Sequence, residues 1–401
     1  MDDYELFCAG RLADPYPLLA DLREREPVHW SERLQAWIVT RYDDVLAALL
    51  DRRFANDRVS VNMKALPPDM REQYAQLGDH VSNWLGFTDP PKHTRLRGLL
   101  RTTFTPALAE AYRPAILAIV DELIDAMLGE REPDLVGGYA FPMPARVIFD
   151  ILGIRDEDAG DFHRWSDDMA AFTGNIGPTL VEVAPRAYES YRALEEFIGT
   201  QVDERKRHPH EDLLTHLTQA EESGELESRV ELTGLAVFTL VAGHETTASL
   251  LGNALKLVLE DDDLRAKLQA EPDVLPAAVE EFLRLEAPIQ LSPRLAGEDI
   301  LLRGATIRSG DAVILHIGAA NHDPARFPEP GALDLDRSFT RHLSFAWGPH
   351  FCLGAPLSRV ETAVALERVL ERMPDMRLTG EPLQWRENMT MRALTALRVG
   401  C

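Results

Sequence analysis

An apolar run in the middle of the chain constrains the fold more than any other feature. Residues 232–243 are apolar on every face of a helix, inside a helical pattern that extends from Glu231 to Glu260. A helix without a polar face has to be buried on all sides. Because the run is too short to span a bilayer, we expect it to form a central core helix around which the other elements assemble.

The remaining periodicity predicts helices with a few short strands. Helices are expected over Tyr16–Arg25, over Val45–Leu50 and through most of the chain from His93 to about residue 260. A hairpin is expected over residues 28–30 and 36–40, and short strands over 300–302, 312–317 and 391–399. Residues 57–90 are expected to be irregular. No repeat or linker interrupts residues 1–401, so we predict one mainly α domain with a small β subdomain.

Charge and cysteine content exclude several classes of function. A formal net charge of -24 disfavours nucleic acid and anionic membranes as partners. The cysteines are Cys8, Cys352 and Cys401, and an odd number this small indicates a reducing compartment, so we expect a cytoplasmic protein. The first residues have neither a basic nor an apolar segment, and no signal peptide or membrane anchor is expected.

The segment 344–354, Ser-Phe-Ala-Trp-Gly-Pro-His-Phe-Cys-Leu-Gly, is the strongest chemical motif. Cys352 comes just before a helical pattern, where backbone N–H groups and the positive helix end stabilise a thiolate. Gly348 and Gly354 are expected to allow turns that a Cβ would hinder, and Phe345 to provide an apolar wall. A buried structural cysteine is one alternative. A zinc site with His342 and His350 is another, but it lacks the usual paired cysteine.

The same segment resembles the haem-binding signature of the cytochrome P450 family. Phe345, Gly348, His350, Cys352 and Gly354 all match that signature, whereas Ala346 stands where the family usually has glycine. The resemblance implies the cytochrome P450 fold and haem b (iron protoporphyrin IX, heme b), with Cys352 as the axial thiolate. Electron donation from that thiolate favours cleavage of the O–O bond.

A second motif lies in the central helix, at Ala242-Gly243-His244-Glu245-Thr246-Thr247. A glycine weakens the helix, and a threonine hydroxyl can bond back to the preceding turn and bend it. A plain core helix and a zinc-protease helix are the alternatives, but the latter needs histidine where Ala248 stands. By resemblance to the family, Ala242 and Gly243 border the oxygen pocket. Thr246 then hydrogen-bonds to the oxygen being activated, and Glu245 relays protons from solvent.

The resemblance also predicts a role for two further groups of residues. His93 and Arg97 share a helix face. Alone they read as a basic surface, but the resemblance makes them propionate ligands together with Arg294 and His350, while Arg95 points elsewhere. Glu281 and Arg284 are three residues apart, but so are Glu110 and Arg113, and Glu189 and Arg192, and such a pair alone is more often on the surface. The resemblance implies that Glu281 and Arg284 form a buried pair with Arg337 as a third member.

The resemblance also implies the partners and the reaction. The chain has no glycine-rich dinucleotide fingerprint, so electrons are expected from a ferredoxin and a ferredoxin reductase, with NAD(P)H acting only indirectly. The reaction implied is monooxygenation of a small apolar molecule, such as a polyketide, macrolide or terpenoid, or a fatty acid, free or tethered to a carrier protein. Oxidative coupling, peroxide-driven chemistry and a thiolate-haem gas sensor are the alternatives. The expected pocket lining comprises Met63, Trp84, Leu85, Phe87, residues 172–178 as a lid, Val237, Phe238, Val241, and residues 289–291 and 389–391.

Overall fold

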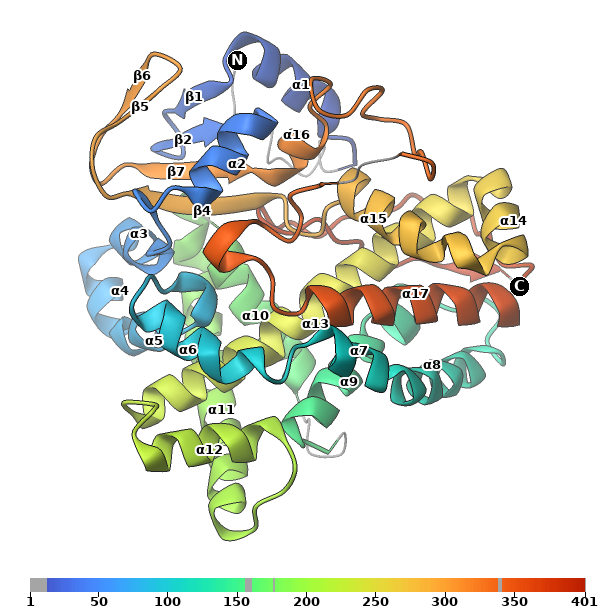
Figure 1. Ribbon diagram of the computed structural model, residues 1–401, viewed down its shortest axis with the longest axis horizontal. Helices are drawn as coiled ribbons and strands as arrows, with labels where there is room; N and C mark the ends of the chain where they lie inside the picture. The colour runs from blue at the N-terminus through green and yellow to red at the C-terminus, as the bar shows by residue number, and fades with distance from the viewer. Residues whose placement is uncertain (1–12, 156–160, 176, 338–340, 401) are drawn as a thin grey trace.

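Helices make up most of the chain in the computed structural model, which describes residues 13–155, 161–175, 177–337 and 341–400 (Figure 1). The α-helices are α1 (Tyr16–Arg25), α2 (Tyr42–Leu50), α3 (Arg58–Ala65), α4 (Pro68–Gln73), α5 (Ala75–Val81), α6 (Lys92–Arg101), α7 (Pro106–Ala111), α8 (Arg113–Met127), α9 (Pro142–Leu152), α10 (Phe162–Gly174), α11 (Leu180–Arg207), α12 (Leu213–Ser223), α13 (Arg229–Glu260), α14 (Asp262–Ala270), α15 (Leu275–Leu285), α16 (Ile317–Asn321) and α17 (Ala355–Arg372). Shorter helical turns are η3 (Leu85–Phe87), η4 (Val136–Ala140), η6 (Gly177–Thr179), η7 (Pro272–Val274) and η8 (Gly348–His350).

Helix α13 is the central element, as the apolar run predicts. The Ser228 hydroxyl caps its first turn by accepting a hydrogen bond of 3.2 Å from the Glu231 backbone N–H. Helices α9, α10, α11, α15 and α17 pack around it, and nearly every residue of 231–241 is buried. Figure 1 shows α13 crossing the middle of the molecule behind α17. The predicted core helix is therefore confirmed.

The β component is small and lies mostly at one end of the molecule. A five-stranded sheet has the order β1 (Val28–Ser31), β2 (Ala36–Val39), β7 (Ala312–His316), β4 (Leu291–Ala296) and β3 (Phe54–Ala55). Strands β2 and β7 are parallel and the other pairs are antiparallel. Two smaller sheets pair β5 (Ile300–Leu302) with β6 (Ala305–Ile307) and β8 (Arg377–Leu378) with β9 (Val399–Gly400). The mainly α class with a minor β part is confirmed.

Two local expectations are wrong. Residues 57–90 are not irregular: the Asp57 carboxylate caps α3 by accepting from the Ser60 N–H at 3.1 Å, and the Pro67–Pro68 pair begins α4. Residues 391–399 do not form one strand. Their backbone meets three different partners through isolated bridges, at Ile289, Trp385 and Asp134, so no continuous ladder can form before β9. The predicted helix Tyr16–Arg25 and the hairpin β1–β2 are confirmed.

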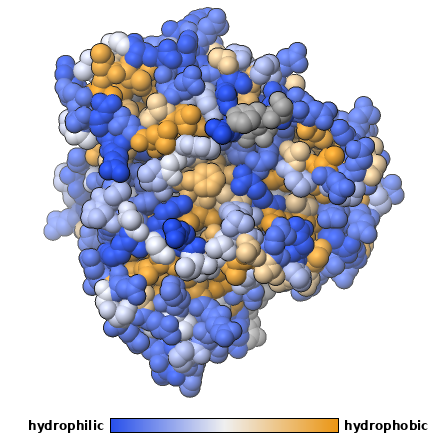
Figure 2. Space-filling view, viewed as in Figure 1, coloured by the Kyte–Doolittle hydropathy of each residue, from blue (hydrophilic) through white to orange (hydrophobic). Residues whose placement is uncertain are grey.

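The surface is polar over most of its area. Figure 2 shows hydrophilic residues covering the larger part of one face, with hydrophobic residues reaching the surface in patches around its middle. Within the part of the chain that the structure describes, no helix combines the length and the apolar character needed to cross a bilayer. Cys8 and Cys401 lie outside the described residues.

Candidate active site

A cavity of about 290 Å³ lies between α13 and the loop that precedes α17. Its lining is mainly apolar, with Cys352 on the loop side and Thr246 on the α13 side. It brings together most of the residues that the sequence singles out, namely His93, Arg97, Ala242, Gly243, Thr246, Arg294, Phe345, His350, Cys352 and Gly354. Glu245 and Gly348 are not among its lining residues. These segments are far apart in the sequence, so the fold assembles the predicted residues around one space.

The loop around Cys352 is held by backbone hydrogen bonds and by its conformation. The Cys352 N–H donates to the Phe345 carbonyl at 2.9 Å, and the Phe351 N–H donates to the Gly348 carbonyl at 3.1 Å. Gly348 has a φ of +73°, and a Cβ there would lie 2.9 Å from a methyl carbon of Leu50. The predicted need for glycine at this turn is confirmed, and Gly348 shapes the loop from outside the cavity.

Gly354 and Gly243 are small for reasons other than those expected. Gly354 has an ordinary φ of -76°, and a Cβ there would lie 3.9 Å from the Cys352 sulfur. It therefore permits no special turn; it leaves space beside the thiol. A Cβ on Gly243 would lie 2.9 Å from Ile148 of α9, so this glycine allows close helix packing as well as bordering the cavity.

Ala346 has a φ of +55°, in the left-handed region that favours glycine. The sequence marks this position as a departure from the signature, because alanine stands where the family usually has glycine. The structure keeps the turn and holds alanine in a strained backbone conformation. The Ala346 N–H still donates to the Leu343 carbonyl at 2.8 Å, so the turn closes normally.

The Cys352 side chain lines the cavity and is exposed there. Desolvation by the surrounding protein raises the pKa of the thiol above its usual value. The backbone N–H groups of Gly354 and Ala355 and the guanidinium groups of Arg97 and Arg359 act in the opposite direction. A metal ion bound to the sulfur would remove the proton outright. The site therefore has backbone donors and guanidinium groups that favour a thiolate, opposed by desolvation of the thiol.

One end of the cavity carries several basic side chains. His93, Arg97, Arg294 and His350 all line it, as the sequence predicts for propionate ligands. The rings of His93 and His350 lie 4.0 Å apart between centroids, and Nε2 of His93 is buried without a hydrogen-bond partner. Burial and the neighbouring cations lower the pKa of His350 to about 3, and burial lowers that of Arg294 to about 10. This end of the cavity is therefore suited to anionic groups. Arg95, by contrast, points away from the cavity, as predicted, and pairs with Glu231 at 2.7 Å.

On the α13 side, the Thr246 hydroxyl donates to the Ala242 carbonyl at 2.9 Å, one turn earlier. This is the back-bond that the sequence predicts for a threonine inside a helix. The preceding residue in the motif, Glu245, points away from the cavity toward α10. Its Oε2 atom lies 3.2 Å from Nη1 of Arg386, which also contacts Asp167 at 2.7 Å. Burial raises the pKa of Glu245 to about 8.

The sequence reasoning missed two charged residues in the cavity wall. Glu361 is buried in α17, where desolvation raises the pKa of its carboxyl well above the usual value. A carboxylate among the apolar residues of a helix is a signal that could have identified it. Arg58 begins α3 and lines the cavity from a stretch that we expected to be irregular. No feature of the sequence alone sets Arg58 apart.

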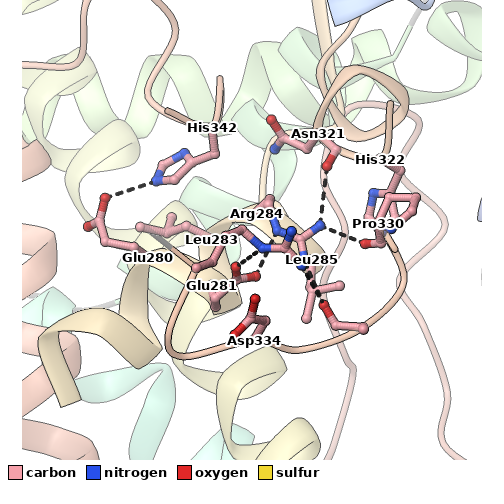
Figure 3. A network of polar contacts seen from close by, with 12 residues as sticks. Glu280, Glu281, Leu283, Arg284, Leu285, Asn321, His322, Pro330, Asp334 and His342 are labelled. Carbon is pink, nitrogen blue, oxygen red and sulfur yellow. Dashed lines mark hydrogen bonds and ion pairs between the residues drawn. The ribbon is translucent and has the colours of Figure 1, made fainter. Parts of the chain in front are cut away.

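The predicted pairing of Glu281 with Arg284 and Arg337 is confirmed. The Glu281 carboxylate is 1% exposed and accepts from Arg284 Nε at 2.7 Å and from Arg337 Nε at 2.6 Å. Arg284 also donates to the carbonyls of Pro330 and Asn321, at 2.6 and 3.3 Å. Figure 3 shows these carbonyls converging on the guanidinium of Arg284. The network joins α15 to the segment that leads to the cysteine loop.

Part of the expected pocket lining is in place. Leu85, Phe238 and Ile289 line the cavity, whereas Val237 and Val241 face the protein core because they lie on other sides of α13. The other expected apolar residues that do not line the cavity are Met63, Trp84, Phe87, Phe172, Leu291, Met389 and Met391. The expected lid includes Ile176, which lies outside the described residues.

Comparisons with known proteins agree with this arrangement. The family model described as Cytochrome P450 matches residues 38–374. The chain is 36% identical over 400 residues to "Polyketide biosynthesis cytochrome P450 PksS" of Bacillus subtilis, covering 96% of this chain and 95% of the relative. It is 38% identical over 410 residues to "Mycinamicin IV hydroxylase/epoxidase" of Micromonospora griseorubida, covering 99% and 96%.

The fold is also similar to that of a solved structure. P450BioI, crystallised with an acyl carrier protein bearing hexadec-9Z-enoic acid, has a TM-score of 0.89 and 32% identity. The match covers 98% of this chain and 99% of that one. Family model, relatives and architecture all agree with the cysteine motif. The chain therefore belongs to the cytochrome P450 family and is an oxidoreductase of the monooxygenase class.

Proposed function

We propose that the protein inserts one atom of molecular oxygen into a C–H or C=C bond of a small, largely apolar organic molecule. The observation that carries the proposal is the cavity itself, in which the Cys352 thiol and the Thr246 hydroxyl share one mainly apolar space. The relatives named for polyketide biosynthesis and for mycinamicin hydroxylation support a secondary metabolite, such as a polyketide, macrolide or terpenoid, as substrate.

Membership of the family implies a haem cofactor, and the residues around the cavity fit haem b. A haem requires a sulfur ligand on one side, open space on the other and cations for its two carboxylates. Cys352 meets the first requirement and the small residues Ala242 and Gly243 suit the second. Arg97 and Arg294 meet the third, together with the unpartnered His93 Nε2. The ligands proposed for haem are therefore Cys352, His93, Arg97, Arg294 and His350, with Phe345, Gly348 and Gly354 shaping the loop.

When bound, the haem supplies the redox chemistry that activates oxygen, and the protein supplies orientation and protons. Cys352 binds the iron as a thiolate and donates electron density to it. The Thr246 hydroxyl lies at the α13 wall of the cavity, where it would exchange its hydrogen bond to the Ala242 carbonyl for one to a reacting group that needs a proton. The apolar lining excludes bulk water, which strengthens each of these electrostatic interactions.

We propose that Glu245 holds a proton and transfers it toward the side of α13 that faces the cavity. Its pKa of about 8 keeps it largely protonated at neutral pH. Arg386 and Asp167, which are respectively 25% and 39% exposed in their side chains, connect it to the surface. His163 is 3.4 Å from Asp167 and is more exposed still. A proton can therefore travel from solvent to Glu245 without crossing the apolar part of the cavity.

Electrons are proposed to come from a ferredoxin and its ferredoxin reductase, so that NADPH or NADH acts only indirectly. We propose one domain across residues 1–401 and a cytoplasmic location.

The carrier protein in the P450BioI structure supports a second form of substrate, one tethered to a carrier rather than free. Oxidative coupling, peroxide-driven oxidation and gas sensing are the competing functions.

The test is a reconstituted reaction. Compounds are first screened for a spin-state change in the haem spectrum, and a hit is then incubated with the protein, a ferredoxin, its reductase and NADPH. The expected result is oxygen consumption that depends on the compound, with one labelled oxygen atom from ¹⁸O₂ in the product. Product that forms with peroxide alone, or without incorporated label, would favour the competing chemistries. No turnover with any hit would support a sensor.

A further inference from the structure

Arg58 is a partly buried cation that the site described above leaves without an anion. It begins α3 and lines the cavity, with its guanidinium carbon 4.1 Å from the centroid of the Phe87 ring. Its Nε atom is buried and has no hydrogen-bond partner. No carboxylate in the described part of the chain forms an ion pair with it.

The other arginines that line the cavity donate hydrogen bonds to other groups of the protein. Arg97 donates to the Phe351 carbonyl at 2.7 Å, and Arg294 donates to the Ser292 hydroxyl at 2.8 Å. The carboxylate of Asp89 is already engaged, because it accepts from the backbone and side chain of Asn56. Arg58, by contrast, has no hydrogen-bond partner at Nε and lies over the Phe87 ring.

A guanidinium in this position calls for an anionic ligand. Burying an unpaired charge is costly, and the contact with an aromatic ring compensates only in part. Desolvation, with repulsion from Arg294, lowers the pKa of Arg58 to about 9, so the group still carries its charge at neutral pH. A carboxylate in the cavity would neutralise this charge. A guanidinium group binds a carboxylate through two parallel hydrogen bonds.

Arg58 lies between two parts of the cavity: it is close enough to Arg294 and His350 for their charges to interact, and it also borders the space beside Phe238. A Cβ on Gly86 would lie 3.3 Å from the Phe238 ring and 4.0 Å from Nη2 of Arg58, so this glycine leaves space beside the guanidinium. Phe238 and Thr246 both line the cavity from α13. They are eight residues apart, which corresponds to about 12 Å along the helix axis. A molecule anchored near Phe238 would need roughly that length to reach the level of Thr246.

We propose that Arg58 binds the carboxylate of the substrate, and that the substrate class includes extended aliphatic acids whose far end reaches Thr246. This inference rests on the proposed monooxygenase function and narrows its substrate. A haem propionate is the other carboxylate that could approach, because Arg294 and His350 line the same cavity. The experiment below separates these two sources.

The test compares an acid with its neutral analogue on the haem-loaded protein. Dodecanoic acid and dodecanamide have the same chain, and each is titrated while the spin state of the haem is followed. We expect the wild-type protein to bind the acid at least tenfold more tightly than the amide. Arg58→Gln should weaken binding of the acid by about 10- to 100-fold and leave the amide nearly unchanged. Arg58→Lys should recover part of the affinity for the acid, because it keeps the charge but not the fork.

Arg52→Gln is the matched control, since it removes the same charge from an exposed position outside the cavity. It should bind both compounds as the wild type does. Equal affinity of the wild type for acid and amide would overturn the proposal. It would also be overturned if Arg58→Gln left acid binding unchanged but released haem faster to apomyoglobin, because the carboxylate would then be a propionate. Failure of the proposed function is distinct: the wild type would lack the thiolate-type carbonyl spectrum before any ligand is added.

Discussion

Replacing Glu281 with alanine removes the shared acceptor of two guanidinium groups. Arg284 is fully buried and Arg337 nearly so, with side-chain exposures of 0% and 10%. Arg284 would keep hydrogen bonds to the carbonyls of Pro330 and Ala332 but lose its only countercharge in this network. An uncompensated buried charge of this kind costs about 3–5 kcal/mol. That is a large share of a typical folding free energy of about 5–15 kcal/mol.

The effect can be measured by urea unfolding followed by circular dichroism and by haem absorbance. A loss of about 3–5 kcal/mol raises the unfolding equilibrium constant by roughly two to three and a half orders of magnitude. Because the network joins α15 to the segment before the cysteine loop, haem should also be lost more readily. The variant is expected to be largely insoluble or free of haem when it is produced.

The pair Glu110 and Arg113 provides a matched control. It has the same three-residue spacing and an N–O distance of 2.9 Å, but both side chains are substantially exposed. Glu110→Ala should therefore change stability little. If Glu281→Ala were soluble, loaded with haem and no less stable than Glu110→Ala, the structural role assigned to the buried network would be refuted.

Three further predictions concern the loop and the α13 motif. Ala346→Gly should raise stability by about 0.5–1 kcal/mol in the same urea assay, because relief of the left-handed strain exceeds the added entropy of glycine; a destabilised variant would contradict the assignment of strain. Thr246→Ala should still bind haem but divert electrons from product to hydrogen peroxide, measured as peroxide formed per NADPH; tight coupling in this variant would refute the role of the hydroxyl. Glu245 has a folded pKa of about 8, above its unfolded value of 4.5, so its burial destabilises the fold progressively as pH rises between these values. Glu245→Gln should therefore gain stability relative to the wild type by about 1 kcal/mol per pH unit in that window, and a difference independent of pH would contradict the assignment.

The residues with the most restrictive local chemistry were predictable from the sequence. The apolar run 232–243 predicts a helix buried on all sides, and the motif around Cys352 has a spacing that few other sites require. The turn at Gly348 follows from the conformational freedom of glycine, and Thr246 bonds back to Ala242 as its place in the helix suggests. In each case a short-range physical constraint determines the result.

Features that depend on long-range packing were not predictable. Gly243 is adjacent to Ile148 of α9, and Glu245 turns toward Arg386, which lies 141 residues further along the chain. No periodicity in the sequence reports such contacts. The role proposed for Arg58 depends on the position of α3 beside the cavity, which the sequence does not reveal. The strand expected over residues 391–399 failed for the same reason, because its alternating pattern does not reveal how many partners its backbone meets.

The central claim is that the sulfur of Cys352 binds a haem iron, and the absorbance spectrum of the reduced protein with carbon monoxide tests it most directly. Wild-type protein supplied with haem should show the red-shifted Soret band that a thiolate ligand produces. Cys352→Ser should lose that band. A wild-type protein that stays colourless, or whose carbonyl complex lacks the shifted band, would contradict the assignment of the site.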